Sequence, residues 1–278
     1  MSDVLYEVEN LNVTFPGRGG ETRAVRDASF VLGRERLAIV GESGSGKSTT
    51  GRALMGLLPP MAKMSATKLN FAGMDVRGYR DADWQKLRGT RISMVMQDPK
   101  YSLNPVKTVG WQIEEAYRLH KKCTSAETKK RALDMLNEVQ IRNPEIVYQQ
   151  YPHQLSGGMG QRVMIAAMLI SEPDLLIADE PTSALDVTVQ NQVLRIMDRL
   201  VRDRGMGLIF ISHNLTVVSS FCDRVLVMYG GKIVEELKAS ELRNAKHPYT
   251  KALVASAPVL GETGQKLATV KRDPAWLT

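Results

Sequence analysis

The fold of this chain is decided by Gly41-Glu42-Ser43-Gly44-Ser45-Gly46-Lys47-Ser48-Thr49, which fits the pattern G-x-x-x-x-G-K-[ST]. Glycines in such a loop let the backbone curl so that successive N–H groups point at one anion. The apolar run Leu37 to Val40 predicts a buried strand before the loop, and Lys47 to Leu58 predicts a helix after it. We therefore expect all nine residues to bind nucleotide phosphates, with Lys47 at the terminal phosphates and Ser48 as a Mg²⁺ ligand. Because strand, loop, Lys-Ser pair and helix occur in register, a merely flexible Gly/Ser loop is the poorer interpretation.

Length and composition are those of a globular protein with a sizeable core, in 278 residues. The longest apolar run, Val163 to Ile170, is far shorter than a membrane span, and the acidic N-terminus has no apolar signal core. We expect a chain that is not itself exported. Cys123 and Cys222 stand in no metal-binding spacing, which favours a reduced, cytosolic setting with both as packing residues.

The net charge of +7 is compatible with a nucleic-acid partner or an anionic membrane surface. Dense basic runs with interleaved aromatic residues are missing, and only Lys121-Lys122 and Lys129-Lys130-Arg131 cluster. Scattered cations on solvated faces are the better interpretation, and we expect no nucleic-acid partner.

Alternating strands and helices predict an α/β fold with a parallel sheet covered on both faces. Before the phosphate loop, two strands joined by the turn Pro16 to Gly20 predict an antiparallel hairpin. Residues 61–78 look irregular apart from a short strand near 69–72, and residues from about 98 to 154 look helical. The remaining expected elements are helices at 81–87, 106–120, 126–139, 156–170 and 189–200, and strands at 6–15, 24–32, 92–96, 175–178, 208–211 and 225–228.

Four polar side chains fall at the carboxyl ends of predicted strands, where ligands bind in parallel sheets: Gln97, Asp179, Glu180 and His213. A carboxylate at Asp179 ends an apolar strand and can be satisfied by Mg²⁺ held with Ser48. Glu180 is placed to orient or deprotonate the attacking water, Gln97 to bridge metal and water, and His213 to donate to the γ-phosphate. Taken singly, His213 is better explained as a structural histidine, and Asp179-Glu180 as a helix-capping pair equally well.

These residues, with Leu155-Ser156-Gly157-Gly158 and Gln161-Arg162, make the chain resemble the ATP-binding subunit of an ABC transporter over about residues 4 to 258. The resemblance implies a P-loop NTPase (RecA-like) core with an N-terminal antiparallel β subdomain and an inserted α-helical subdomain at about 98–158. The ABC ATPase domain then spans 1–258, and 259–278 is a C-terminal tail without an assigned role.

The resemblance also implies further site residues. Ser156, Gly157 and Gly158 would hold the γ-phosphate of the ATP bound to the opposite subunit, from a helix N-terminus. Ser183-Ala184-Leu185-Asp186 resembles the loop that crosses the dimer interface beside Glu180. Phe15 matches the family's adenine-stacking aromatic, although a core or edge aromatic is an equally good interpretation of the residue alone.

Within the family, four stretches resemble the dipeptide/oligopeptide/nickel importer branch: Val40 to Ser48, Met96-Gln97-Asp98-Pro99 with Ser102-Leu103-Asn104-Pro105, Asp179 to Gln190, and His247-Pro248-Tyr249-Thr250. This branch implies ATP and Mg²⁺, a second ABC ATPase subunit that is a paralogue or a copy of this chain, two integral membrane permease subunits, and indirectly an extracytoplasmic solute-binding protein. We expect a peripheral protein on the cytoplasmic face of the inner membrane. Peptides, nickel and opine-like solutes are all compatible cargoes.

Three features depart from the family pattern. Gly160 replaces a residue that is usually basic, which weakens the composite site that this signature completes, and Asn214 replaces a usual Asp with a small expected effect. Because no cysteine follows Cys222, we expect no iron–sulfur cluster. Two other functions stay open: the ATPase of an unfused ABC exporter, and a soluble ABC ATPase acting on DNA or ribosomes. The single phosphate loop, without zinc modules or long coiled coils, disfavours the second.

Overall fold

The computed structural model describes residues 4–17, 20–97, 102–183, 185–256 and 273–277. The chain divides into two compact units, Met1–Asp81 with Gly207–Thr278, and Ala82–Met206, which are described separately below. Three positions in the quoted motifs (Asp98, Pro99 and Ala184), part of the Pro16–Gly20 turn and most of the tail 259–278 lie outside the described residues.

An antiparallel sheet opens the first unit, with strand order β2-β1-β5-β6 and β4 also paired to β1. Its strands are β1 (Tyr6–Gly17), β2 (Gly20–Leu32), β4 (Lys63–Ser65), β5 (Lys68–Phe71) and β6 (Met74–Asp75). The β1–β2 pair confirms the expected hairpin, with Tyr6 opposite Leu32 and Phe15 opposite Thr22. The short strand expected near 69–72 is confirmed as β5, but β4 and β6, in the part expected to be irregular, were missed because they are too short to produce a periodic apolar pattern.

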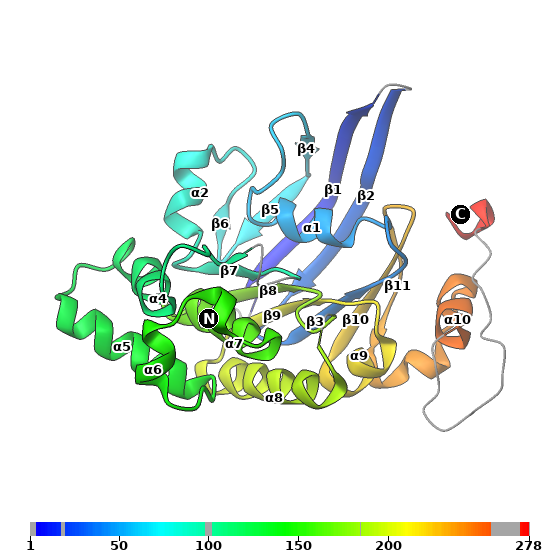
Figure 1. Cartoon of the computed structure of the whole chain (residues 1–278). Helices are drawn as coiled ribbons and strands as arrows, with labels where there is room; N and C mark the ends of the chain where they lie inside the picture. Colours follow the sequence, from blue (N-terminus) through cyan, green and yellow to red (C-terminus); the bar gives the residue numbers. More distant parts are fainter. Residues whose placement is uncertain (1–3, 18–19, 98–101, 184, 257–272, 278) are drawn as a thin grey trace. The chain divides into compact units, whose positions relative to one another are not determined.

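Four further strands, of which three are parallel to one another, complete the sheets of this unit. Figure 1 shows β3 (Arg36–Val40), β9 (Gly207–Ile211), β10 (Arg224–Tyr229) and β11 (Lys232–Lys238). β3 pairs in parallel with both β9 and β10, and β11 pairs antiparallel with β10. Every residue of β9 is buried, as continuous apolar runs predict for a strand covered on both faces. The helical elements of this unit are α1 (Lys47–Ala53), α9 (Leu215–Phe221), η2 (Ala239–Asn244), α10 (Pro248–Ala255) and η3 (Pro274–Leu277).

Helix α1 ends earlier than the sequence predicted, at Ala53 instead of Leu58. Gly56 has a φ of 61°, which is the left-handed conformation that ends helices. The Leu57 N–H then reaches back to the Arg52 carbonyl at 2.8 Å, and the Gly56 N–H reaches the Ala53 carbonyl at 3.1 Å. Leu57 and Leu58 follow Gly56 directly and continue the apolar pattern of the helix. The predicted helix was therefore too long at its C-terminal end.

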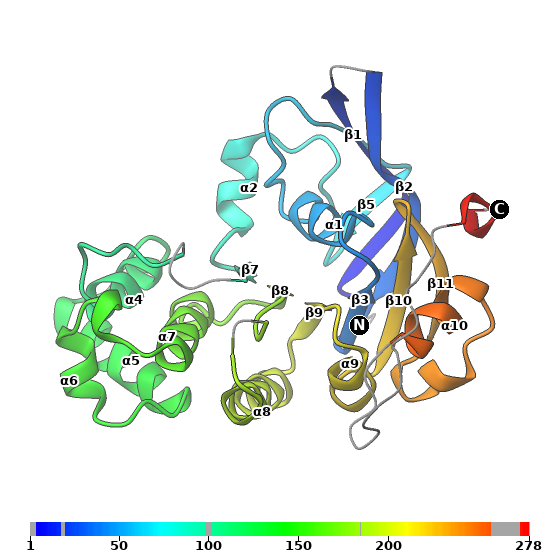
Figure 2. The same cartoon turned by 45° about the vertical axis from the view of Figure 1, so that its right-hand side comes forward.

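The second unit combines a parallel strand pair with helices (Figure 2). β7 (Ile92–Val95) pairs in parallel with β8 (Leu175–Asp179), and all residues of both strands are buried. The helices are α2 (Asp81–Leu87, beginning at the last residue of the first unit), α4 (Val109–Arg118), α5 (Ser125–Glu138), α6 (Pro144–Gln149), η1 (Pro152–Gln154), α7 (Gly157–Leu169) and α8 (Val187–Arg204). A capping box between Thr124 and Glu127 begins α5, and Gly205, with a φ of 56°, ends α8.

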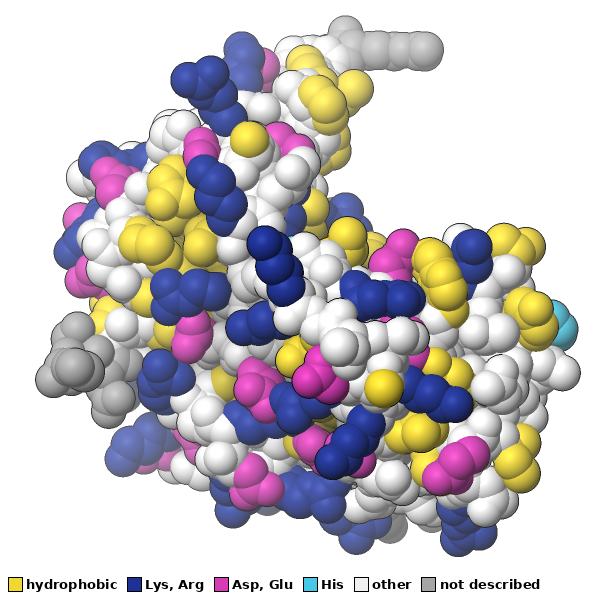
Figure 3. Space-filling model, turned by 90° about the vertical axis from the view of Figure 1, so that its left-hand side faces the viewer, with side chains coloured by type: hydrophobic (Ala, Val, Ile, Leu, Met, Phe, Trp, Pro, Cys, Tyr) yellow, Lys and Arg dark blue, Asp and Glu magenta, His cyan; other side chains and the backbone are white. Residues whose placement is uncertain are grey.

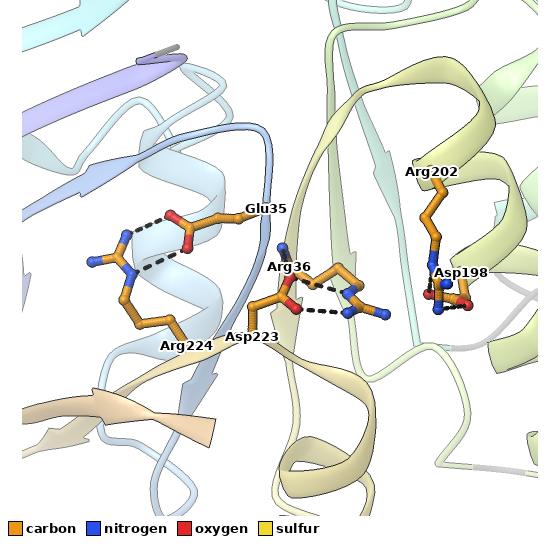
Figure 4. A network of polar contacts seen from close by, with 6 residues as sticks. All are labelled: Glu35, Arg36, Asp198, Arg202, Asp223 and Arg224. Carbon is orange, nitrogen blue, oxygen red and sulfur yellow. Dashed lines mark hydrogen bonds and ion pairs between the residues drawn. The ribbon is translucent and has the colours of Figure 1, made fainter. Parts of the chain in front are cut away.

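Charged side chains pair locally within each unit, as Figure 4 shows for three pairs. In the first unit, Arg36 donates to Asp223 at 2.6 Å and Arg224 donates to Glu35 at 2.6 Å, which ties the start of β3 to the start of β10. In the second unit, Arg202 pairs with Asp198 one turn earlier on α8. The face drawn in Figure 3 likewise interleaves Lys and Arg with Asp and Glu. Scattered cations of this kind agree with the solvated-face interpretation of the net charge.

Among the described residues, no helix is both long and apolar enough to cross a membrane.

Candidate functional site

The phosphate loop adopts a conformation that requires glycine. Gly44 and Gly46 have φ values of 81° and 103°, in the region that L side chains rarely adopt. A Cβ on Gly46 would stand 2.4 Å from the Ala24 carbonyl oxygen, whereas a Cβ on Gly44 would meet nothing within 4 Å. The loop is thus packed tightly at Gly46 and open at Gly44. Together with the lack of an acidic residue in the first turn of α1, this shape and charge fit a phosphate group.

Lys47 curls back over this loop. Its side chain is only 7% exposed, and Nζ donates to the carbonyl oxygens of Gly41 at 2.9 Å and Glu42 at 2.8 Å. Ser48 and Thr49, the next two residues of α1, are half-buried. The loop therefore holds an ammonium group against its own backbone.

Helix α10 and the turn between β10 and β11 both form hydrogen bonds with the phosphate loop. The Glu42 N–H donates to the Tyr249 hydroxyl at 2.9 Å, and the Gly231 N–H donates to the Ser45 carbonyl at 3.1 Å. The Ser45 hydroxyl is buried within the loop and makes no hydrogen bond to the described residues. Tyr249 belongs to the motif His247 to Thr250, but its contact with Glu42 was not predicted, because a contact across 207 positions leaves no periodic signal in the sequence.

His213 lies at the same sheet edge as the phosphate loop. β3 and β9 are adjacent and parallel, with Ile39 opposite Ile211, so the residues that follow them leave the sheet together. The His213 side chain is exposed. Asn214, the departure noted above, caps α9 by accepting from the Val217 N–H at 3.2 Å, so the substitution keeps a good N-cap. Phe15 is half-buried near the end of β1 in the same unit.

In the second unit, the strand pair brings Gln97 and the acidic pair to one edge. Val95 of β7 lies opposite Ala178 of β8; Gln97 comes two residues after Val95, and Asp179-Glu180 comes directly after Ala178. Asp179 is 8% exposed at the last position of β8, while Glu180 is half-buried and Gln97 exposed. Glu180 also has a φ of 48°, a left-handed conformation that costs a non-glycine residue energy and recurs at functional positions. No sequence pattern had pointed to this strain.

The predicted signature forms the start of α7. Ser156 is the N-cap, and its hydroxyl accepts from the Met159 N–H at 3.3 Å. Gly158 is buried because α8 approaches it closely: a Cβ there would lie 2.4 Å from Val189 Cγ1. Arg162 donates to the carbonyls of Gly158 at 3.2 Å and Gln140 at 2.8 Å. Burial, and then the nearby charge of Arg142, lower the pKa of Arg162 below its usual value.

Asp186 is the N-cap of α8. One of its carboxylate oxygens accepts from the N–H groups of Thr188 and Val189, both at 3.0 Å. The side chain is exposed. Capping was an alternative role for Asp179-Glu180, but the acidic residue that caps α8 is Asp186.

Each unit therefore carries its own set of predicted site residues. The first holds Phe15, the phosphate loop and His213. The second holds Gln97, the signature Ser156 to Gly158, Asp179, Glu180 and Asp186. Within the described residues, no three His, Cys, Asp or Glu side chains cluster so as to hold a metal ion by themselves.

Comparison with known proteins shows which family this chain resembles. A model of the ABC transporter family matches residues 26–183. The chain is 46% identical to the dipeptide transport ATP-binding protein DppD of Bacillus subtilis (strain 168), covering 97% of this chain and 82% of that protein. It is 45% identical to the oligopeptide transport ATP-binding protein OppD of the same organism, covering 99% of this chain and 78% of that protein.

A solved structure, a dimeric ATP-binding cassette in a post-hydrolysis state bound to ADP and Pi, is 25% identical. It superposes with a TM-score of 0.76, covering 84% of this chain and 99% of that one. The likeness confirms the α/β cassette fold, with an antiparallel sheet and helical parts, that the sequence predicted.

Proposed function

Because the chain belongs to the ABC transporter family of ATP-binding cassettes, we propose that it is the ATPase subunit of an importer that takes up peptides or a related small solute, such as nickel. The observation that carries the proposal is the phosphate loop, with Lys47 folded over the carbonyls of Gly41 and Glu42. The identity to peptide-transport ATP-binding proteins over nearly the whole chain supports import of peptides ahead of export or a soluble role.

The first unit binds the triphosphate. The open face at Gly44 leaves room for phosphate oxygens to approach backbone N–H groups, and the ammonium of Lys47 places a positive charge where the terminal phosphates bind. Phe15 stacks on the adenine ring, and His213 donates to the γ-phosphate from the edge shared by β3 and β9.

The second unit supplies the hydrolytic groups. Glu180 orients or deprotonates the attacking water, and Gln97 positions that water through its amide. Mg²⁺, when bound, neutralises charge on the phosphate oxygens, and Ser48, Gln97 and Asp179 carry the hydroxyl, amide and carboxylate oxygens that suit it. The position of Asp179 as the last residue of β8 supports such a role, because ligands bind at the carboxyl ends of parallel strands.

The signature acts on a second subunit. Ser156, Gly157 and Gly158 hold the γ-phosphate of ATP bound to a paralogue or a second copy of this chain, and the loop at Asp186 crosses that interface. The domain 1–258, with its helical part at about 98–158, couples closure of this pair to two membrane permease subunits on the cytoplasmic face of the membrane. A solute-binding protein on the opposite side delivers the cargo.

Isolation of the chain from membranes of its source cells tests this assignment. We expect a tagged copy to co-purify with two integral membrane proteins and a second ATP-binding subunit, and its deletion to abolish uptake of a radiolabelled dipeptide. Deletion of the gene for a cytosolic ATPase of unrelated fold is the control. Co-purification with ribosomes instead, or unchanged dipeptide and nickel uptake in the deletion strain, would contradict the proposal.

A further inference from the structure

The C-terminal segment Asp273–Leu277 is packed against the two elements that hold the phosphate loop. Figures 1 and 2 both show its short turn η3, in red, beside α10 and β11. The centroid of the Trp276 ring lies 5.5 Å from the ring centroid of Tyr249 and 5.4 Å from that of Tyr229. The centroids of the two tyrosine rings are 4.4 Å apart, so the three rings form one aromatic cluster.

Backbone contacts fasten the same segment. Lys232 Nζ donates to the Leu277 carbonyl at 2.8 Å, and the Tyr229 hydroxyl donates to the Asp273 carbonyl at 3.3 Å. Leu277 also packs against Gly230, where a Cβ would meet Leu277 Cδ2 at 3.0 Å. Gly231, the next residue, is the one whose N–H donates to the Ser45 carbonyl of the phosphate loop.

Tyr249 is placed by its local sequence. His247 is the N-cap of α10, and its Nδ1 accepts from the Tyr249 N–H at 3.2 Å. Pro248 follows at the first helical position, where its missing N–H costs nothing. Glu235 of β11 accepts from the N–H of Lys246 at 2.6 Å and so fixes the approach to this helix. The result is a tyrosine whose side chain is fully buried and whose hydroxyl meets the loop.

That hydroxyl acts on Lys47 through a single peptide unit. The Glu42 N–H that donates to Tyr249 belongs to the same planar peptide as the Gly41 carbonyl, which accepts from Lys47 Nζ. In a trans peptide these two groups point in opposite directions, so fixing one fixes the other. Tyr249 therefore sets the direction of a carbonyl that positions the ammonium of Lys47.

From this geometry we infer that Tyr249 is a positioning residue for ATP binding and that Trp276, in the C-terminal segment, keeps it in place. The inference rests on the proposed role of the phosphate loop. Removal of the Tyr249 hydroxyl frees the Gly41–Glu42 peptide to rotate and lets Lys47 leave the phosphate position. Removal of the Trp276 ring uncovers Tyr249 and Tyr229 and loosens the same contact.

ATP affinity of the purified chain, measured by titration calorimetry in the presence of Mg²⁺, tests the inference. Tyr249→Phe keeps the ring and loses one hydrogen bond to the loop, which should weaken ATP binding roughly two- to tenfold. Trp276→Ala should weaken binding over the same range, and Trp276→Phe should restore most of it. In steady-state hydrolysis by the assembled transporter, the KM for ATP should rise while kcat changes little.

Tyr6→Phe is the matched control. Tyr6 is also fully buried in the first unit, and its hydroxyl donates to the backbone carbonyl of Leu54 at 3.0 Å. Leu54 is not part of the phosphate loop. Both Tyr→Phe variants should lower the melting temperature, but only Tyr249→Phe should weaken ATP binding. Unchanged ATP affinity in Tyr249→Phe, or an equal loss in Tyr6→Phe, would overturn the inference. A wild-type affinity in Lys47→Ala would instead overturn the proposed role of the loop.

Discussion

Gly158 lies so close to Val189 that a Cβ built on Gly158 would stand 2.4 Å from Val189 Cγ1. The two residues belong to the starts of α7 and α8, so the contact sets how closely the two helices approach. Glycine at this position is therefore required by packing in the second unit, in addition to the phosphate contact proposed for it.

The substitution Gly158→Ala should destabilise the protein by about 1–3 kcal/mol, because the added methyl group forces Val189 or the helix to shift. Urea unfolding monitored by circular dichroism measures the loss. Val189→Ala added to Gly158→Ala should recover part of the stability by removing the clashing methyl groups. If the double variant is as unstable as the sum of the two single losses, the contact is not the cause.

Asp186 should contribute to stability as the cap of α8. Asp186→Ala removes the acceptor for two backbone N–H groups and should cost about 1 kcal/mol in unfolding free energy. Asp186→Asn keeps an acceptor oxygen and should retain most of that stability. Comparison of the two variants by urea unfolding also separates capping from any role of the charge at a dimer interface. Equal losses in both variants would refute the capping explanation.

Cys222 should resist alkylation in the folded protein. Burial, opposed in part by Arg36, raises the pKa of its thiol to about 12, so the reactive thiolate is scarce up to pH 9. Cys123 is partly exposed on the approach to α5. Iodoacetamide at pH 8, followed by peptide mass spectrometry, should label Cys123 first and Cys222 only after denaturation. Labelling of both at the same rate in folded protein would contradict this account.

The sequence predicted an element well where an apolar run and its turn or motif residues lie next to each other along the chain. The phosphate loop, the hairpin and the buried strands β3, β8 and β9 were all predicted close to their observed bounds. Each combines an apolar run with turn or motif residues next to it, and these signals are local.

The missed features depend on contacts between distant positions or on backbone conformation. The end of α1 at Ala53 is followed by a left-handed glycine, Gly56, that the apolar pattern does not register. The left-handed φ of Glu180 and the close approach of Val189 to Gly158 are visible only once the second unit is folded. The hydrogen bond from Glu42 to Tyr249 joins residues 207 positions apart, and the sequence around Tyr249 did not predict it.

We propose that this chain hydrolyses ATP with Lys47 as a phosphate ligand and Glu180 as the residue that activates water. Parallel ATP-binding and phosphate-release measurements on wild type, Lys47→Ala and Glu180→Gln, each with Mg²⁺ and the partner subunit, test it most directly. The account predicts that Glu180→Gln binds ATP as wild type does and releases almost no phosphate, because an amide cannot accept the proton. Lys47→Ala should lose both activities. Wild-type phosphate release from Glu180→Gln would contradict the account.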